Sequence, residues 1–210
     1  MKLHKTSFHG PAGVLEAVID APVLAAGIAQ RGVAFIAHPH PLFGGTMDNK
    51  VAQTLARAFA QCGWQAVRFN FRGVGASAGA YDEGRGELQD LLAAIAHFAP
   101  HGALALAGFS FGAFVVSQAI AVLPADRTPE KLVLVGTAAT RFNVPPIPDA
   151  LHPHTLVVHG EVDDTIPLSD VFNWARPQNL PVVVVPGVAH FFHGQLVLLR
   201  NLVVRHLHAD

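Results

Sequence analysis

The sequence predicts an α/β protein with a mostly parallel sheet that carries helices on both faces. Short β-rich runs alternate along the chain with longer runs of helical periodicity. Several β-rich runs, such as residues 132–135 and 182–185, consist entirely of valine and leucine, which is typical of strands covered on both faces. With 210 residues, 51% of them apolar, the chain can bury one sizeable core, and we expect a single domain over residues 1–210.

The expected elements follow one another in a regular order. A hairpin between Lys2 and Ala21 comes first and would add antiparallel strands at one edge of the sheet. The later strands are expected at residues 33–37, 65–71, 103–107, 131–135, 155–158 and 182–185. The helices are expected at residues 50–61, 87–98, 168–175 and 195–207, with one more that begins at Phe111. The Gly- and Ala-rich segment 73–86 and the Pro-rich segment 140–153 are expected to be loops within the domain.

Composition and charge argue against several classes of function. A formal net charge of -1, without runs of like charge, provides no field to attract nucleic acid or an anionic membrane. No stretch approaches the ~18 apolar residues of a spanning helix, and the basic first residues are not followed by the apolar region of a signal peptide. The single cysteine, Cys62, argues against a disulfide framework and a cysteine zinc cluster. We therefore expect a cytoplasmic protein with a small-molecule partner and make no prediction of its oligomeric state.

Reactive side chains follow four of the expected strands. In an open parallel sheet the ligand crevice lies beyond the carboxyl ends of the strands, so we expect these side chains to share one rim. A serine, a carboxylate and a histidine occur among them in that chain order, which is typical of hydrolases that attack a carbonyl with the serine. The residues are His38, His40, Ser110, Asp163 with its neighbour Asp164, and His190.

Ser110 is the centre of the pentapeptide Gly108-Phe109-Ser110-Phe111-Gly112, between an expected strand and an expected helix. A turn this tight needs glycines where a Cβ would clash, and it lifts the serine hydroxyl clear of the sheet. The pattern predicts a nucleophilic serine. The alternative is a serine in an ordinary glycine-rich turn.

Four segments of the chain match motifs of a known superfamily. They are the Arg-Gly-x-Gly-x-Ser loop within residues 71–77, the pentapeptide 108–112, the acid motif 159–167 and the histidine motif 187–192. On these motifs the chain resembles the α/β-hydrolase superfamily over nearly its whole length, and within it the small, lidless bacterial esterases and dienelactone-hydrolase-like proteins. Asn70 departs from the aspartate often found before the first motif. The resemblance implies an α/β-hydrolase fold without a sizeable cap domain, because residues 140–153 are too few for a helical lid.

The resemblance also implies roles for the site residues. Ser110 would be the nucleophile, and His190 the general base that takes its proton and later returns it to the leaving group. The spacing His159-Gly160-x-x-Asp163 selects Asp163 as the acid that orients the imidazole, with Asp164 as the alternative.

The tetrahedral intermediate would need two donors for its oxyanion. The backbone N–H of Phe111 is the expected first donor. For the second, Pro39 and Pro41 have no N–H, so His40 is expected, with Leu42 or Phe43 as alternatives. Phe43 and Phe191 are expected to bind the substrate. Further aromatic candidates for the pocket wall are Phe111, Phe114, Phe192 and Trp174, of which Phe114 fits a core position better.

Two other patterns suggest different chemistry. His38-x-His40 and His152-x-His154 have a spacing that metal ligands can use, but no cysteine or carboxylate triplet accompanies them. Residues 73–78 fit the dinucleotide pattern G-x-G-x-x-A, yet residues 79–86 separate them from the expected helix. We therefore expect neither a metal nor a nucleotide cofactor.

The sequence thus predicts a serine hydrolase that cleaves carboxylic esters of small or soluble acyl groups through an acyl-enzyme, without a cofactor. A thioesterase or a dienelactone-type lactonase remains open, because the same three side chains serve each reaction. From a different class, a ligand-binding protein without catalytic activity could share the fold.

Overall fold

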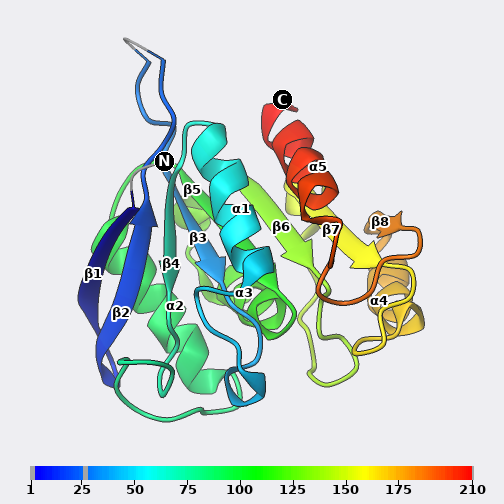
Figure 1. Cartoon of the computed structure of the whole chain (residues 1–210), viewed down its shortest axis with the longest axis horizontal. Helices are drawn as coiled ribbons and strands as arrows, with labels where there is room; N and C mark the ends of the chain where they lie inside the picture. Colours follow the sequence, from blue (N-terminus) through cyan, green and yellow to red (C-terminus); the bar gives the residue numbers. More distant parts are fainter. Residues whose placement is uncertain (1–2, 26–27, 210) are drawn as a thin grey trace.

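The computed structural model of the protein describes residues 3–25 and 28–209. An eight-stranded sheet in the order β1-β2-β4-β3-β5-β6-β7-β8 lies at its centre (Figure 1). The β1–β2 and β2–β4 pairs are antiparallel, and all other neighbouring strands are parallel. The predicted, mostly parallel sheet is confirmed. The strands are β1 (Leu3–Gly10), β2 (Gly13–Asp20), β3 (Val33–Ala37), β4 (Gln65–Phe69), β5 (Leu104–Phe109), β6 (Lys131–Val135), β7 (Thr155–Gly160) and β8 (Val182–Val185).

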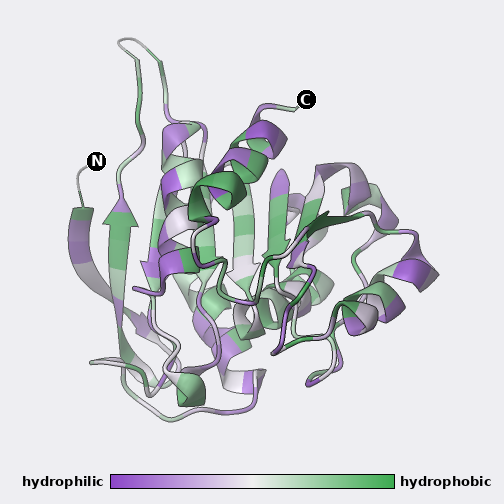
Figure 2. Ribbon diagram, turned by 45° about the vertical axis from the view of Figure 1, so that its right-hand side comes forward, coloured by the Kyte–Doolittle hydropathy of each residue, from purple (hydrophilic) through white to green (hydrophobic). Residues whose placement is uncertain are grey.

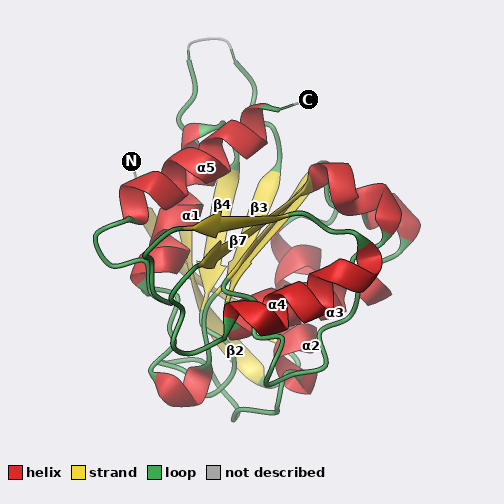
Figure 3. Cartoon of the chain, turned by 90° about the vertical axis from the view of Figure 1, so that its right-hand side faces the viewer, coloured by secondary structure: helices red, strands yellow, loops and turns green. Residues whose placement is uncertain are grey.

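Helices cover both faces of the sheet, as predicted. On one face lie α1 (Lys50–Gln61) and α5 (Leu196–His208); on the other lie α2 (Arg85–Phe98), α3 (Phe111–Val122) and α4 (Leu168–Ala175) (Figure 3). Successive strand residues enter opposite cores, as Phe35 and Ile36 of β3 do. Figure 2 shows the hydrophobic residues concentrated in the central strands between these layers. No helix in the described part of the chain is long and apolar enough to cross a membrane.

Most element boundaries agree with the sequence. β3, α1, β6, α4 and β8 coincide with their expected ranges. β4 ends earlier than expected, at Phe69, and α2 begins earlier, at Arg85, while β5 and β7 continue further, to Phe109 and Gly160. The opening hairpin forms the edge of the sheet, and Lys2, its expected first residue, lies outside the described residues.

The expectation that the valine run 182–185 is covered on both faces was wrong. β8 is the last strand of the sheet and pairs only with β7 among the described strands. Val183 is consequently 37% exposed, whereas every residue of β6 is buried. Residues 132–135 of β6 are as apolar as residues 182–185 of β8, and their difference in burial follows from their position in the sheet.

The crevice of this sheet lies between β3 and β5. These strands are neighbours, but β3 leads through α1 to β4 on one side, while β5 leads through α3 to β6 on the other. Where connections diverge in this way, a crevice opens beyond the carboxyl ends of the strands. The segment from His38 and the turn at Ser110 follow these two strands directly, so the topology brings them to one place.

Candidate active site

Ser110 occupies the turn between β5 and α3 in a backbone conformation that residues with a Cβ rarely adopt. Its φ and ψ are 57° and -117°, a region that costs on the order of 1–3 kcal/mol and persists only where the surroundings enforce it. Its amide donates a 2.8 Å hydrogen bond to the Val135 carbonyl of β6. A Cβ on Gly108 would overlap the backbone of Gly112, and a Cβ on Gly112 would overlap the Ala37 carbonyl. Both positions therefore need glycine, and the predicted strand–turn–helix is confirmed.

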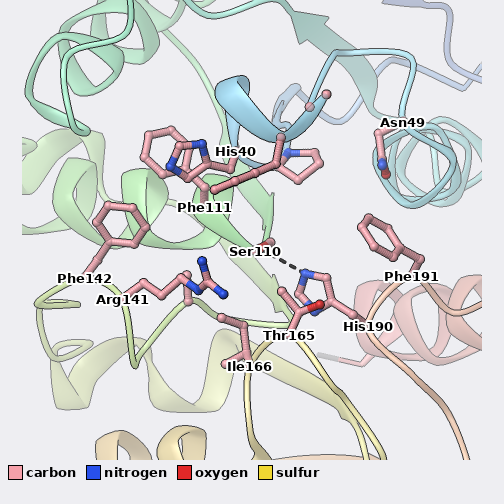
Figure 4. A pocket seen from close by; sticks show the side chains of 15 residues that line it. His40, Asn49, Ser110, Phe111, Arg141, Phe142, Thr165, Ile166, His190 and Phe191 are labelled. Atoms are coloured by element: carbon pink, nitrogen blue, oxygen red, sulfur yellow. Dashed lines mark hydrogen bonds between the residues drawn. The ribbon is translucent and has the colours of Figure 1, made fainter.

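His190 lies in the loop between β8 and α5 and faces Ser110. Its Nε2 is 3.1 Å from Ser110 Oγ, the interaction drawn as a dashed line in Figure 4. The ring is buried and packs against both Phe109 and Phe191, with centroid distances of 4.9 and 5.1 Å. This packing restricts the imidazole to an orientation that presents Nε2 to the serine.

Asp163 follows β7 and accepts hydrogen bonds through both carboxylate oxygens. Its Oδ2 accepts from His190 Nδ1 at 2.6 Å. Its Oδ1 accepts from the backbone amides of Thr165 and Ile166 at 2.9 and 2.7 Å. The neighbouring Asp164 is exposed, and its Oδ1 lies 3.3 Å from the Thr165 hydroxyl. Of the two carboxylates that the sequence leaves open, Asp163 is the one that reaches His190.

The protonation of this chain of side chains follows from its hydrogen bonds. Burial would raise the pKa of Asp163, but the hydrogen bonds from His190 and the Ile166 amide outweigh burial and hold the pKa below its ordinary value. An ionised carboxylate can only accept, so the His190 proton lies on Nδ1 and Nε2 accepts from the Ser110 hydroxyl. Such an arrangement can remove the hydroxyl proton while the oxygen attacks an electrophile.

His159 contacts the same carboxylate from the end of β7. Its ring is fully buried, its Nε2 donates to the Ile166 carbonyl at 2.9 Å, and the same nitrogen lies 3.4 Å from Asp163 Oδ2. Burial lowers the pKa of His159 despite the nearby carboxylate, so the ring stays neutral. Its hydrogen bond to Ile166 stabilises the loop that positions Asp163, and the neutral ring places no positive charge beside the carboxylate.

A cavity of about 290 Å³ opens over Ser110 and His190 (Figure 4). Four phenylalanines belong to its apolar wall, and Phe43 among them is 73% exposed. The predicted site residues that line it are His40, Phe43, Ser110, Phe111, His190 and Phe191. Asp163 lies behind the imidazole and does not contribute to the lining.

Two aromatic residues that the sequence suggested for the pocket wall lie elsewhere. Phe192 has a φ of 53°, and this turn of the backbone directs its side chain into the core under α5, away from the Phe191 side chain. Trp174 on α4 donates its indole N–H to the Pro145 carbonyl at 3.3 Å and does not belong to the cavity lining. Phe114 is a core residue, as expected.

The first expected oxyanion donor, the amide of Phe111, belongs to the first residue of α3. The first amides of a helix have no partner within the helix, and this one follows Ser110 directly. The position thus suits a donor that faces the reacting carbonyl.

The loop after β3 determines which amide is available as the second donor. The Leu42 amide donates to His40 Nδ1 at 3.2 Å, and the Phe43 amide donates to the His40 carbonyl at 3.1 Å, so both alternatives are engaged within the short 3-10 helix η1 (Pro41–Phe43) and its cap. His40 Nε2 lies 3.1 Å from the Tyr81 hydroxyl, which ties the ring to a second loop. His40 thus remains the candidate donor.

His38 fastens the start of this loop. Its ring is fully buried; Nδ1 donates to the Pro39 carbonyl at 2.6 Å and Nε2 accepts from the Phe71 amide at 3.1 Å. The imidazole therefore joins the loops that follow β3 and β4. Burial lowers its pKa to about 4, although the hydrogen bond to the Pro39 carbonyl favours the protonated ring.

This neutral histidine should make the stability of the protein depend on pH. The folded state keeps His38 neutral down to about pH 4, whereas the unfolded chain protonates it near pH 6.5. The unfolded state therefore binds more protons between these values, and the free energy of unfolding should fall by up to about 3 kcal/mol from pH 6.5 to 4 on account of this group. Chemical denaturation across this range measures the slope.

His38→Gln, which keeps an acceptor for the Phe71 amide, should flatten part of that slope. His206, whose pKa burial and the neighbouring Lys131 lower to about 4, contributes in the same direction and remains. The matched control is His101→Gln at an exposed position. If the free energy of unfolding depended equally on pH in the wild type and in His38→Gln, the buried neutral His38 would not be a source of this dependence.

The loop after β4 is anchored by the asparagine that departs from the superfamily pattern. Asn70 Oδ1 accepts from the Met47 amide at 2.8 Å, and its Nδ2 donates to Glu16 Oε2 at 2.9 Å. Its carbonyl accepts from the Ser77 hydroxyl at 2.8 Å. An aspartate could not donate to Glu16, so asparagine suits this site.

The structure also shows where the dinucleotide-like segment and the His-x-His pairs of the sequence lie. α2 begins at Arg85, so the glycines of residues 73–78 do not open a helix as a dinucleotide fingerprint would. Both ring nitrogens of His38 bond to backbone groups, and His152 Nε2 bonds to the Ile147 carbonyl at 2.9 Å. Within residues 3–25 and 28–209, no three side chains of His, Cys, Asp or Glu group together as metal ligands would.

Sequence reasoning missed part of the cavity wall. The residues concerned are Asn49, Ala138, Arg141, Phe142, Thr165 and Ile166. Three of them lie in the loop after β6, where no site residue is predicted from the sequence. The rule that found Ser110 and Asp163 places this loop at the same edge of the sheet, but it does not determine whether Arg141 faces the cavity.

Comparisons with known proteins agree with this geometry. No protein-family model matches the sequence. A curated relative, an uncharacterized protein of Rickettsia prowazekii, is 36% identical over 120 residues, which are 54% of this chain and 48% of that protein, so the chain spans about half the length of this relative.

Two solved structures match over almost their full length. An α/β serine hydrolase without a lid from Xanthomonas campestris has 34% identity and a TM-score of 0.85, with 99% of this chain and 94% of that chain covered. An α/β serine hydrolase homologue from Coxiella burnetii has 39% identity and a TM-score of 0.80, with 99% and 98% covered. Between β6 and β7, where a lid would be inserted, the chain forms only a loop and the 3-10 helix η3 (Asp149–His154). The chain belongs to the α/β serine hydrolases without a lid.

Proposed function

We propose that this protein hydrolyses carboxylic esters of small or soluble acyl groups through a covalent acyl-enzyme on Ser110. The observation that carries the proposal is the hydrogen-bonded chain from Asp163 through His190 to Ser110 beneath an open, apolar cavity. Nucleophile, base and orienting acid within hydrogen-bond reach of one another are the signature of an activated serine.

In the acylation step, Ser110 Oγ attacks the ester carbonyl while His190 Nε2 takes its proton. Asp163 holds Nδ1–H and stabilises the imidazolium that forms, and its lowered pKa keeps it ionised for this purpose. The negative charge that develops on the carbonyl oxygen would be bound by the Phe111 amide and the His40 amide. When the tetrahedral intermediate collapses, the C–O bond to the alcohol breaks and His190 gives the proton to the departing oxygen.

In the deacylation step, water takes the place of the alcohol. His190 removes a proton from the water as it attacks the acyl carbonyl, and the same two amides bind the oxyanion. Collapse breaks the bond to Ser110 Oγ, which recovers its proton from His190 and releases the acid. No cofactor participates in this sequence.

The cavity supports a preference for small acyl groups. Its volume of about 290 Å³ is at the lower limit of ordinary small-molecule sites. Thr165 and Ile166 form one wall of the cavity, next to His190 (Figure 4). Without a lid, a long acyl chain would extend into water and gain little from the protein.

Hydrolysis of p-nitrophenyl esters of increasing acyl length, with matching acyl-thioesters, tests the proposal. We expect turnover of short-chain esters, with kcat/KM falling as the chain outgrows the cavity. A strong preference for long chains would contradict the small-substrate assignment, and faster cleavage of thioesters than of esters would make the protein a thioesterase.

Covalent labelling separates an enzyme from a ligand-binding protein on the same fold. A fluorophosphonate should attach to Ser110 and to no other serine, as identified by mass spectrometry of the digested protein. A folded protein that neither reacts with the phosphonate nor cleaves any ester would favour the binding role.

A further inference from the structure

Arg141 is a cation at the wall of the active-site cavity, and no carboxylate of residues 3–25 and 28–209 forms an ion pair with it. It follows β6, lines the same cavity as Ser110 and His190, and extends from the side occupied by Phe142 (Figure 4). None of the ion pairs among the described residues includes Arg141, whereas Arg68, Arg72 and Arg85 each pair with an acidic side chain. Its guanidinium lies 5.9 Å above the ring centroid of Phe43.

The charge of Arg141 acts inside the cavity. No Asp or Glu belongs to the lining formed by the described residues, so the guanidinium is the lining's single fixed charge. Burial and, second to it, the charge of Arg141 lower the pKa of His40, which also lines the cavity. Close to the guanidinium, the electrostatic field therefore favours a negatively charged group.

The neighbours of Arg141 hold its guanidinium near the aromatic wall. Its Cζ atom lies over the Phe43 ring, within the distance at which a cation is attracted to an aromatic face. Phe142, the next residue, stacks on Phe114 with a centroid distance of 4.6 Å and an interplanar angle of 15°, which anchors the loop. The edge of the guanidinium carries a fork of N–H donors that matches a carboxylate with two parallel hydrogen bonds.

We propose that Arg141 binds a carboxylate of the substrate, so that the enzyme prefers small esters that carry this negative charge over their neutral counterparts. This inference rests on the proposed function and specifies its substrate class. The apolar walls, Phe111 and Phe191 among them, would enclose the carbon chain between the ester and the carboxylate. The carboxylate could belong to the acyl part or to the alcohol part of the ester.

Two pairs of isosteric substrates test the inference and distinguish these two sources. The acyl pair is mono-p-nitrophenyl glutarate and p-nitrophenyl glutaramate; the alcohol pair is 4-carboxyphenyl butanoate and 4-carbamoylphenyl butanoate. The readout is the ratio of kcat/KM for the carboxylate over the carboxamide, corrected for spontaneous hydrolysis. We expect Arg141→Gln to lower this ratio about tenfold or more in one pair, since a hydrogen-bonded charge pair is worth that factor.

Arg141→Lys should restore only part of the ratio, because lysine keeps the charge but loses the fork. The matched control is Arg57→Gln on the exposed face of α1, which removes the same charge remote from the cavity and should leave the ratio unchanged. A ratio unaffected by Arg141→Gln in both pairs, with carboxamide esters still cleaved by the wild type, would overturn the inference and leave the proposed function intact. A wild type that cleaves none of the four esters and does not react with a fluorophosphonate would overturn both.

Discussion

Replacing Ser110 with alanine is expected to lower kcat for a short p-nitrophenyl ester by about 10⁶-fold. The loss should be this large because the Ser110 hydroxyl is the group hydrogen-bonded to the base. His190 Nε2 is directed at Ser110 Oγ at 3.1 Å, and the backbone at φ 57° holds that oxygen at the floor of the cavity. What remains would be the contribution of the oxyanion donors and of substrate binding.

Ser117→Ala is the matched control for this substitution. Ser117 is buried like Ser110 and lies within α3, the helix that Ser110 caps. Its hydroxyl, however, donates to the Ala113 carbonyl at 2.9 Å and does not line the cavity. We expect its kcat to stay within about twofold of the wild-type value. Residual activity in Ser110→Ala above about a tenth of the wild type would indicate another nucleophile.

The double variant Ser110→Ala with His190→Ala provides a second check. Residues that act as one catalytic unit are strongly non-additive, so removing both should cost little more than removing either alone. Multiplicative losses would mean that serine and histidine contribute independently, which the hydrogen bond between them argues against.

The strands and helices, and hence the layers of the fold, could be predicted because the spacing of apolar residues within each short segment indicates its secondary structure. A run such as residues 132–135 is apolar at every position and is buried at every position. The order of strands in the sheet is not local information. The valine run of β8 carries the same signal, yet it lies at an edge, and the antiparallel hairpin forms the other edge.

The site divides in a similar way. Ser110, Asp163 and His190 could be predicted because each follows a strand in a short motif, and a shared edge of the sheet brings them together. Arg141 could not, because its position depends on the path of a loop, and that path depends on the stacking of Phe142 on Phe114 across elements distant in the sequence.

Asp163→Asn is expected to lower kcat by about 10⁴-fold, through the tautomer of His190 rather than through the shape of the site. Asparagine Oδ1 can still accept from the amides of Thr165 and Ile166, so the loop should keep its conformation. Its amide nitrogen, however, would donate to His190 Nδ1. The imidazole proton would then move to Nε2, which could no longer accept from Ser110.

The matched control, Asp164→Asn, alters an exposed carboxylate one position along the chain and should change kcat by less than about threefold. Steady-state kinetics of both variants, with thermal unfolding to verify that each is folded, separates the two residues. A severe loss in Asp164→Asn beside a mild one in Asp163→Asn would reverse the assignment. The 2.6 Å distance from His190 Nδ1 to Asp163 Oδ2 argues for the opposite result, because one carboxylate at that distance satisfies the only proton that Nδ1 can donate.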